Sequence, residues 1–390
     1  MTATSWGKAA LAILLSAAAS CGTSEGGPAP LISSREAGLA PGAGEQVSLN
    51  GELIEQLTRL RVDDPDYPER IPLNMFEDKS FVGIVETVSE RTPETRVVKG
   101  SLEGIAEGRF TMVVHKGLVA LYLIGDDGMY LLHPVPEGHV VKRGGAEPDL
   151  IEEAIADEAG EAAEGEAGFV QPNSEDGSRV DVAILYTPSA AREWGDAAKV
   201  ETSAYLNEEF SNDALAASGT SIRITAIRQV PDQTPARLGS AMASETVRAE
   251  RGAATADLVL LFHHRYNSAH GVAYCYKPRL RFEYNRDGRY LGLVSADSLQ
   301  IYMTPSHELG HLFGAGHTDL GSCMSRGYSF RSGGSRWGDM MDYDGADNRL
   351  PLFSNPQLRF RGVPVGTERA NNAEAIRQSR AAIANYVEAP

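Results

Sequence analysis

The chain has 390 residues, of which 42% are hydrophobic and 23% charged, and its formal net charge is −17 at pH 7. This length is enough for two folded domains, each with a core of ordinary size. Acidic side chains outnumber basic ones by 53 to 36, so no basic excess indicates nucleic acid as a partner. All of the acidic excess lies before residue 178, because residues 178–390 hold 23 acidic and 23 basic side chains.

The first residues predict export. Lys8 precedes the apolar run Ala9–Ala19, which is too short to span a bilayer and is typical of a secretory signal. Ala18-Ala19-Ser20-Cys21 follows the pattern of a bacterial lipobox, with Ala where Leu is usual. We therefore expect residues 1–21 to be a signal peptide that ends in lipidation at Cys21, with ordinary cleavage beside Cys21 as the alternative. The protein would then lie in the bacterial cell envelope as a lipoprotein, or be secreted after processing.

The next residues predict a tether and a small β unit. Residues 22–50 are rich in Gly, Ser, Ala and Pro with little periodicity, which favours a flexible tether. Residues 51–145 contain short runs of strand composition, separated by turn residues, and predict a mainly-β unit. The clearest runs are Ser80–Val85, Arg109–Val114, Leu118–Ile124 and Met129–Leu132, with Gly125–Gly128 as a hairpin connection. His115, His133 and His139 are scattered singly there and are interpreted as surface or satisfied histidines.

Residues 146–177 predict an extended linker. Glu147–Asp176 contains 11 acidic residues and neither Lys nor Arg. Such a block repels itself and cannot bury enough apolar area to fold alone. Its place between two folded units is also where proteolytic cleavage is easiest. The alternative is a solvated acidic helix, to which Leu150, Ile151 and Ile155 would give an apolar face.

Residues 178–390 alternate strand and helix signals and predict an α/β domain with a mixed sheet backed by helices. Helical patterns cover residues 189–218 and 236–250. The expected strands are Arg179–Tyr186, Ser221–Val230, Ala256–Phe262, Gly271–Tyr276 and Leu291–Ala296.

The stretch Thr304–His317, T-P-S-H-E-L-G-H-L-F-G-A-G-H, predicts a catalytic zinc site. His307 and His311 are four residues apart, so they share one face of a helix. Gly314 can end that helix with a sharp turn, which brings His317 beside the other two. Three imidazoles and a fourth position open to water form a catalytic site for one Zn²⁺. Glu308 is then placed to take a proton from that water, and the alternative is a solvated helix with surface histidines.

The three cysteines fit the same picture. If Cys21 carries lipid, Cys275 and Cys323 remain to pair and would close a loop around the zinc stretch. In an oxidising compartment such a disulfide contributes roughly 3–4 kcal/mol by constraining the unfolded chain. Two buried free thiols are the alternative.

The extended motif H-E-x-x-H-x-x-G-x-x-H resembles that of the metzincin metallopeptidases. The order of strands and helices in residues 178–390 is also similar to that of the metzincin catalytic domain. The resemblance implies a mixed five-stranded sheet with a zinc-binding helix. In that family the strand before the last one runs antiparallel along the cleft and pairs with bound peptide, a role that falls to Gly271–Tyr276.

Metzincins also carry a tight turn with a Met beneath the metal. Trp337–Tyr343, W-G-D-M-M-D-Y, lies at a suitable interval after His317. Aligned on the M-x-Y pattern, Met341 is the turn methionine, with Met340 as the alternative. The resemblance implies that Tyr343 ligates zinc at rest or hydrogen-bonds the transition state, or else that it only packs.

The C-terminal residues resemble the reprolysin-like and peptidyl-Asp metallopeptidase group. Those proteins show a Phe-Ser-Asn-Pro stretch, here Phe353–Pro356, and an Asn-led helix, here residues 373–387 after Asn371 and Asn372. Reprolysin-type members have Asp directly after the third His, whereas this chain has Thr318 and then Asp319.

The resemblance makes the 51–145 unit a propeptide, released by cleavage in or near the acidic linker, which would inhibit the catalytic domain of residues 178–390. No Cys lies between residues 22 and 176, so a propeptide Cys cannot bind the zinc. An Asp or Glu ligand, or steric filling of the cleft, would have to serve instead.

The expected function is that of a zinc metalloendopeptidase made as a proenzyme, acting on protein or peptide substrates. Glu308 would be the general base and Tyr343 the donor to the oxyanion. Contact with a membrane is expected only through the N-terminal lipid anchor. The alternatives are a zinc hydrolase of some other amide and a surface adhesin with an inactive protease domain.

Overall fold

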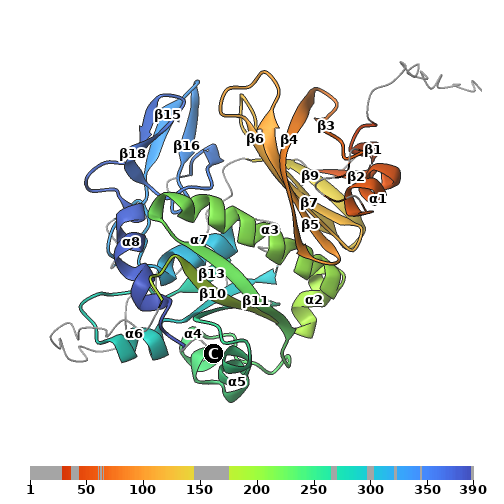
Figure 1. Cartoon of the computed structure of the whole chain (residues 1–390). Helices are drawn as coiled ribbons and strands as arrows, with labels where there is room; N and C mark the ends of the chain where they lie inside the picture. The colour runs from red at the N-terminus through yellow and green to blue at the C-terminus, as the bar shows by residue number, and fades with distance from the viewer. Residues whose placement is uncertain are drawn as a thin grey trace, which may run out of the picture.

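The computed structural model describes residues 29–36, 44–59, 61, 64, 66–144, 175–264, 270–296, 303–319, 323–342 and 345–387. These residues form two packed parts, an N-terminal unit built on a large antiparallel sheet and an α/β domain that carries the candidate site (Figure 1). Within the described residues, no helix combines the length and the apolar character that a bilayer span requires.

The N-terminal unit is a nine-stranded antiparallel sheet in the order β1-β2-β9-β8-β7-β6-β5-β4-β3. Its elements are β1 (Ile32–Glu36), β2 (Glu45–Leu49), α1 (Gly51–Arg59), β3 (Arg70–Phe76), β4 (Lys79–Thr92), β5 (Thr95–Leu102), β6 (Arg109–His115), β7 (Leu118–Ile124), β8 (Met129–Val135) and β9 (Gly138–Arg143). The four strand runs found in the sequence are all present, and the expected hairpin closes with a hydrogen bond from the Gly125 N–H to the Gly128 carbonyl.

Residues 22–50 do not form a tether throughout, because β1 and β2 lie within them. The sheet curls until its two edge strands meet. The Leu31 N–H donates to the Pro72 carbonyl at 3.0 Å, and the Asn74 side chain bridges both backbone groups of Ile32. Strands β1 and β2 carry mostly polar side chains, which is why the composition of residues 22–50 favoured a tether. The helix α1, also not expected, fills the curled sheet with Leu53, Ile54 and Leu57.

The α/β domain is built on a five-stranded sheet in the order β11-β10-β12-β14-β13. Strands β10, β11, β12 and β14 run parallel, and β13 pairs with β14 antiparallel at one edge. The bounds are β10 (Arg179–Tyr186), β11 (Ser221–Gln229), β12 (Leu258–His263), β13 (Gly271–Ala273) and β14 (Leu291–Ser295). The mixed sheet expected from the sequence is therefore present, although β13 is shorter than the expected strand 271–276.

Two helices expected as single pieces are each divided. Residues 189–218 form α2 (Pro188–Trp194), α3 (Ala197–Leu215) and a short 3₁₀ turn, because Gly195 ends α2 at φ 101° and Asp196 caps the start of α3. Residues 236–250 form α4 (Leu238–Ala243) and α5 (Glu245–Ala253), divided at Ser244. The helix α6 (Phe282–Gly288) precedes β14 and was not expected.

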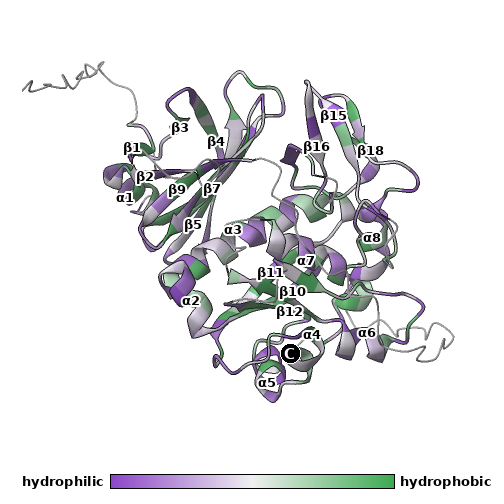
Figure 2. Ribbon diagram, turned by 180° about the vertical axis from the view of Figure 1, so that it is seen from behind, coloured by the Kyte–Doolittle hydropathy of each residue, from purple (hydrophilic) through white to green (hydrophobic). Residues whose placement is uncertain are grey.

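The remaining elements follow β14. They are α7 (Thr304–Leu312), β15 (Ser329–Ser332), β16 (Ser335–Gly338), β17 (Asn348–Arg349), β18 (Asn355–Phe360), β19 (Val363–Val365) and α8 (Asn372–Ile383). Helix α7 packs against β13, β14 and α3, so it is enclosed by the sheet on one side and by a long helix on another (Figures 1 and 2). Its apolar surroundings position the histidines that it carries.

Candidate metal centre

Helix α7 and the turn after it bring three histidines together. Gly314, at φ 90°, ends the helix with hydrogen bonds from the Gly314 N–H to His311 and from the Ala315 N–H to Gly310. The chain then returns so that the ring of His317 lies 5.0 Å from that of His307 and 4.6 Å from that of His311, centroid to centroid. All three side chains are buried. The turn at Gly314 and the convergence of the three rings agree with the geometry expected from the sequence.

The Nε2 atoms of the three imidazoles point at one another. The Nε2 atom of His317 lies 3.0 Å from that of His307 and 3.0 Å from that of His311. The other ring nitrogens are held by carbonyls: Nδ1 of His307 donates to Met340 at 3.0 Å, and Nδ1 of His311 donates to Ala315 at 2.9 Å. Since a carbonyl only accepts, both Nδ1 atoms carry hydrogen, and a neutral ring then presents a lone pair at Nε2.

Glu308 lies beside this cluster, fully buried and directed toward the edge strand β13. A side-chain carbon added at Gly271 would lie 2.3 Å from the Glu308 Oε1 atom, and one at Gly292 would lie 3.1 Å from its Cβ. The carboxylate therefore packs closely against Gly271, and the base of the side chain packs against Gly292. This is a packing reason for Gly271 that its sequence context did not reveal.

The segment Asp339–Asp342 passes beneath α7. A side-chain carbon added at Gly310, between the first two histidines, would lie 2.6 Å from the Met341 sulfur. Met341 thus packs against the helix under the histidines, while Met340 contributes its carbonyl to His307. Both methionines are fully buried. This arrangement favours Met341 over Met340 as the methionine of the turn.

Asp339 organises that turn from a fully buried position. Its carboxylate accepts backbone hydrogen bonds from Tyr328 at 3.2 Å, Met341 at 3.1 Å and Ser354 at 2.7 Å. Burial raises the pKa of Asp339 to about 7, although the backbone N–H groups oppose that rise by stabilising the carboxylate. One side chain therefore connects the turn to the Phe353–Pro356 stretch.

Asn372 holds the peptide that precedes the third histidine. Its Oδ1 atom accepts from the Gly316 N–H at 3.1 Å, and its Nδ2 atom donates to the Gly316 carbonyl at 2.9 Å. The Asn372 N–H in turn donates to the Ser354 hydroxyl at 2.9 Å. The Ser354 and Asn372 motifs, noted in the sequence only as points of resemblance, thus form the support of His317.

Cys275 and Cys323 form the expected disulfide, with their Cα atoms 5.4 Å apart. The bridge joins the segment after β13 to the segment after His317. It lies against the site, since the Cys275 sulfur is 3.6 Å from Nδ1 of His311. Because the two sulfurs are bonded to each other, they are not available as ligands to a metal, and the three histidines remain the candidate donor set.

Helix α3 supports α7 from behind. The Ser211 and Ser306 hydroxyls are 2.7 Å apart, and Ser306 immediately precedes the first histidine. Ser211 and Asp339 are isolated polar residues outside the zinc stretch, and they carry no local sequence signal for a role at the site. Asn372 was noted only through the family resemblance. Tyr343 and Cys21 lie outside the described residues, so their predicted roles stay predictions.

Comparison with known proteins matches part of the chain to a family model. Residues 176–354 match the model of the metallo-peptidase family M12 in its reprolysin-like form. No curated protein sequence matches the chain. The solved structures that are similar to it include the following two. The structure of a chaperone-substrate complex is 15% identical, over 72% of this chain and 39% of that one, with a TM-score of 0.43. Metalloproteinase-II from Bacteroides fragilis is 11% identical, over 79% of this chain and 90% of that one, with a TM-score of 0.41.

The family match spans β10 to Ser354 and includes the three histidines, Glu308 and Met341. Residues 176–354 are therefore similar to a reprolysin-like metallopeptidase of family M12, as the sequence resemblance predicted.

Proposed function

We propose that this protein is a zinc metalloendopeptidase that hydrolyses peptide bonds at the centre formed by His307, His311 and His317. The observation that carries the proposal is the convergence of three Nε2 atoms at a helix whose Glu308, next to His307 in sequence, is buried and faces the edge strand of a sheet. Nothing in the sequence spacing alone requires the edge strand to lie against this helix.

The donor set fits a zinc ion. If Nδ1 of His307 and His311 both carry hydrogen, two Nε2 lone pairs face the Nε2 atom of His317, which can donate to only one of them. A cation bound between the rings would accept these lone pairs and remove their mutual repulsion. With Zn–N bonds of about 2.0–2.1 Å and tetrahedral angles, ligand nitrogens lie about 3.3 Å apart, close to the observed 3.0 Å. The carbonyl acceptors orient the rings, as partners of metal-ligating histidines commonly do.

A bound zinc ion would supply Lewis-acid chemistry, lowering the pKa of water and polarising a carbonyl. Glu308 would accept the proton of the attacking water and deliver it to the leaving amine. Close packing against Gly271 and Gly292 would hold its side chain in place. Strand β13, at the edge of the sheet, would pair with an extended substrate by main-chain hydrogen bonds. Tyr343 would donate to the oxyanion.

The test is cleavage of casein or a peptide library by the full chain after maturation. We expect turnover that stops with a zinc chelator and returns with added zinc. Glu308→Gln should retain one zinc per chain and lose about 10²–10⁴-fold in kcat, the usual contribution of a general base. Full activity in Glu308→Gln would remove that residue from its role. Zinc binding without any peptide cleavage would favour a different amide substrate.

We also propose that the chain is made as a proenzyme and matures by cleavage within residues 146–177. Because residues 22–176 contain no Cys, the inactive state would depend on an acidic ligand to the metal or on steric filling of the cleft. Comparing the intact chain with the same chain cut in the linker tests this. Equal rates of peptide cleavage would contradict the proenzyme.

Export completes the proposal. The disulfide next to the centre is of the kind that persists in oxidising compartments, and the N-terminal residues carry a signal pattern with Cys21 as the lipidation site. Mass spectrometry of the membrane fraction of expressing bacteria would detect a diacylglyceryl modification on Cys21. If the mature N-terminus lies beyond Cys21 and carries no lipid, the protein is secreted and not anchored.

A further inference from the structure

Helix α3 is enclosed between the N-terminal unit and the metal centre. On one side it packs against β6, β7 and β8, and on the other against α7 (Figure 1). The helix is therefore a shared element, which belongs to the α/β domain by sequence and to the interface by position. The strength of the contact between the N-terminal unit and α3 therefore decides whether the two parts stay together when the linker is cut.

The central strands of the N-terminal sheet are apolar on both faces. Along β7, Val119, Leu121 and Leu123 point into the core of the N-terminal unit itself. The alternate residues, Ala120, Tyr122 and Ile124, belong instead to the core of the α/β domain and are fully buried. Four more side chains of the unit join them in that core: Val97, Val113, Met129 and Leu131. An interface that continues a domain core resembles those of obligate partners.

Charges surround this apolar contact and are complementary. Acidic side chains of α3 meet basic side chains of the sheet in three places. Lys99 lies 2.7 Å from Glu209 and 2.9 Å from Asp213. Glu201 lies 2.9 Å from His115 and 2.7 Å from Lys116. The third place is the pair of Arg91 and Glu208, whose two nitrogen–oxygen contacts are 2.7 and 2.9 Å long.

The pair of Arg91 and Glu208 makes separation unfavourable. Glu208 is only 3% exposed, and burial raises its pKa while the Arg91 hydrogen bonds lower it. Arg91 comes from the N-terminal unit and also donates to the Ile224 carbonyl at 2.7 Å. If the unit left, Glu208 would lose both hydrogen bonds from the Arg91 guanidinium, and charge-assisted bonds of this kind are stronger than neutral ones.

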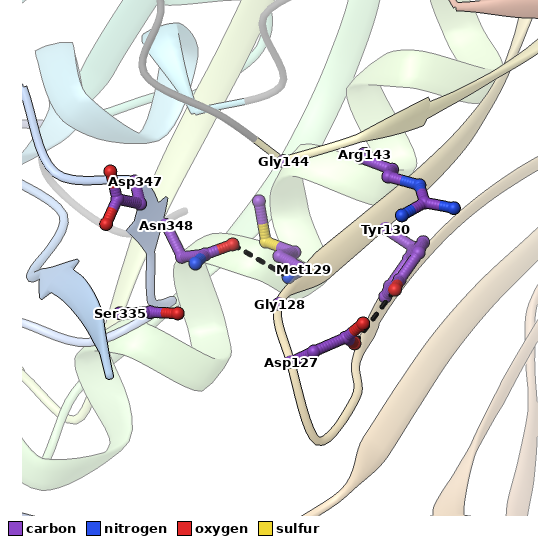
Figure 3. Close-up of a pocket in the computed structure, with 9 residues that line it drawn as sticks. All are labelled: Asp127, Gly128, Met129, Tyr130, Arg143, Gly144, Ser335, Asp347 and Asn348. Atoms are coloured by element: carbon purple, nitrogen blue, oxygen red, sulfur yellow. Dashed lines mark hydrogen bonds between the residues drawn. The ribbon is translucent and has the colours of Figure 1, made fainter. Parts of the chain in front are cut away.

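A second contact lies beyond the turn that carries Met341. The Met129 N–H donates to Oδ1 of Asn348 at 3.1 Å, next to an open cavity of about 320 Å³ between the β7–β8 hairpin and β16–β17 (Figure 3). In the same region the Arg361 N–H donates to Glu107 at 2.7 Å. The N-terminal unit thus touches the α/β domain both on α3 and on the segment that follows the candidate metal centre.

We propose that residues 29–144 are a permanent non-covalent part of the enzyme, which stays bound to α3 after the acidic linker is cut. This differs from the released propeptide that the sequence resemblance implied. The proenzyme proposal then requires that the linker before it is cut, and not the bound unit, supplies the inhibition. The unit would support the centre through α3, whose Ser211 contacts Ser306 at the start of the metal-binding stretch. The proposal concerns the interface and does not depend on peptidase activity.

The experiment uses the full chain in a Glu308→Gln background, which prevents self-digestion. A glutamyl endopeptidase cuts the acidic linker, gel electrophoresis verifies that two fragments have formed, and size exclusion with light scattering measures their mass. We expect one species containing both fragments at about 0.15 M and at about 1 M salt, because salt screens the ion pairs but not the apolar contact. Separation of the wild-type fragments at either salt concentration would overturn the proposal.

Two variants locate the interface. Lys99→Glu places a negative charge opposite Glu209 and Asp213, and Tyr122→Ala empties the apolar contact; in each, the cut fragments should separate. The double variant Lys99→Glu with Glu209→Lys should restore binding. Lys79→Glu is the matched control, since its partners Asp126 and Asp127 lie within the N-terminal unit, and it should behave as wild type.

Thermal unfolding of each uncut variant verifies that it is folded. If the cut fragments of folded Lys99→Glu and folded Tyr122→Ala both stay together as in wild type, the assignment of the interface to α3 is wrong. Because the readout is mass, failure of the peptidase proposal would leave this result unchanged, and separation of the fragments would leave the peptidase proposal intact.

Discussion

Replacing Asn372 by Ala tests whether the third histidine depends on a residue far from the zinc stretch. The Asn372 side chain is fully buried and makes both hydrogen bonds to the Gly316 peptide, at 3.1 and 2.9 Å. Asn372→Ala leaves the N–H and the carbonyl of that peptide unpaired. A buried group left without its partner costs about 1–3 kcal/mol, so the segment around His317 should lose about 2–6 kcal/mol.

Part of that loss should appear as weaker zinc binding, because the peptide directly precedes His317. Loss of the groups that orient metal ligands typically lowers metal affinity by about 10–100-fold. The assay is competition for zinc between the folded protein and a chromophoric chelator, which requires no substrate. The absorption spectrum of the cobalt-substituted protein would report a changed ligand geometry.

Asn371→Ala is the matched control. Asn371 begins the same helix and accepts the Glu374 N–H at 3.2 Å, so its loss should cost about 1 kcal/mol of helix capping and leave zinc affinity unchanged. If Asn372→Ala binds zinc as tightly as wild type, or if both variants weaken it equally, Asn372 only stabilises the fold and does not position His317.

Three further predictions concern the disulfide, a buried histidine and the wall beside Glu308. Replacing Cys275 and Cys323 by Ser should lower the free energy of unfolding by about 4 kcal/mol, because the bridge closes a 48-residue loop. Burial lowers the pKa of His139 to about 4, so the free energy of unfolding should fall by about 3 kcal/mol as the pH drops from about 6.5 to 4. His139→Gln should remove that part of the pH dependence. Gly271→Ala should lower kcat about 100-fold, since the new carbon would displace the Glu308 carboxylate.

Each of these has a simple measurement. Denaturant titration under oxidising conditions reports the disulfide, and an unchanged midpoint in the Ser variant would contradict its role. The difference between wild type and His139→Gln in the same titration from pH 7 to 4 isolates His139. The sign follows because the unfolded chain takes up a proton that the folded chain excludes. For Gly271, the control is Gly288→Ala, where an added carbon meets nothing within 4 Å; equal activity of the two variants would refute the steric argument.

The zinc stretch could be predicted from sequence because its geometry is local. Helical spacing sets the relation of His307 to His311, and one turn at Gly314 sets that of His317. The supports of these residues could not be predicted in the same way. Asp339 and Asn372 hydrogen-bond to residues 15 and 56 positions away, and a single buried Asp or Asn has no periodic pattern. The family resemblance pointed to Asn372 without giving its physical reason.

Strands β1 and β2 could not be predicted from the sequence for a different reason. Composition separates flexible from folded segments only when the folded segment has an apolar face. Strand β1 pairs through its backbone at the edge of the sheet and buries little besides Ile32, so its composition resembles that of a linker. Polar edge strands of this kind are expected where a sheet must avoid pairing with other chains.

The apolar run Leu118–Ile124 requires that both faces of its strand be covered. A strand in a free-standing sheet alternates apolar and polar residues, because one face meets solvent. This run is apolar on both faces, so a second apolar surface must cover it, and α3 does. A propeptide that dissociated would expose that face to water. The sequence of β7 therefore argues, independently of the ion pairs, that the two parts of this protein are adapted to remain together.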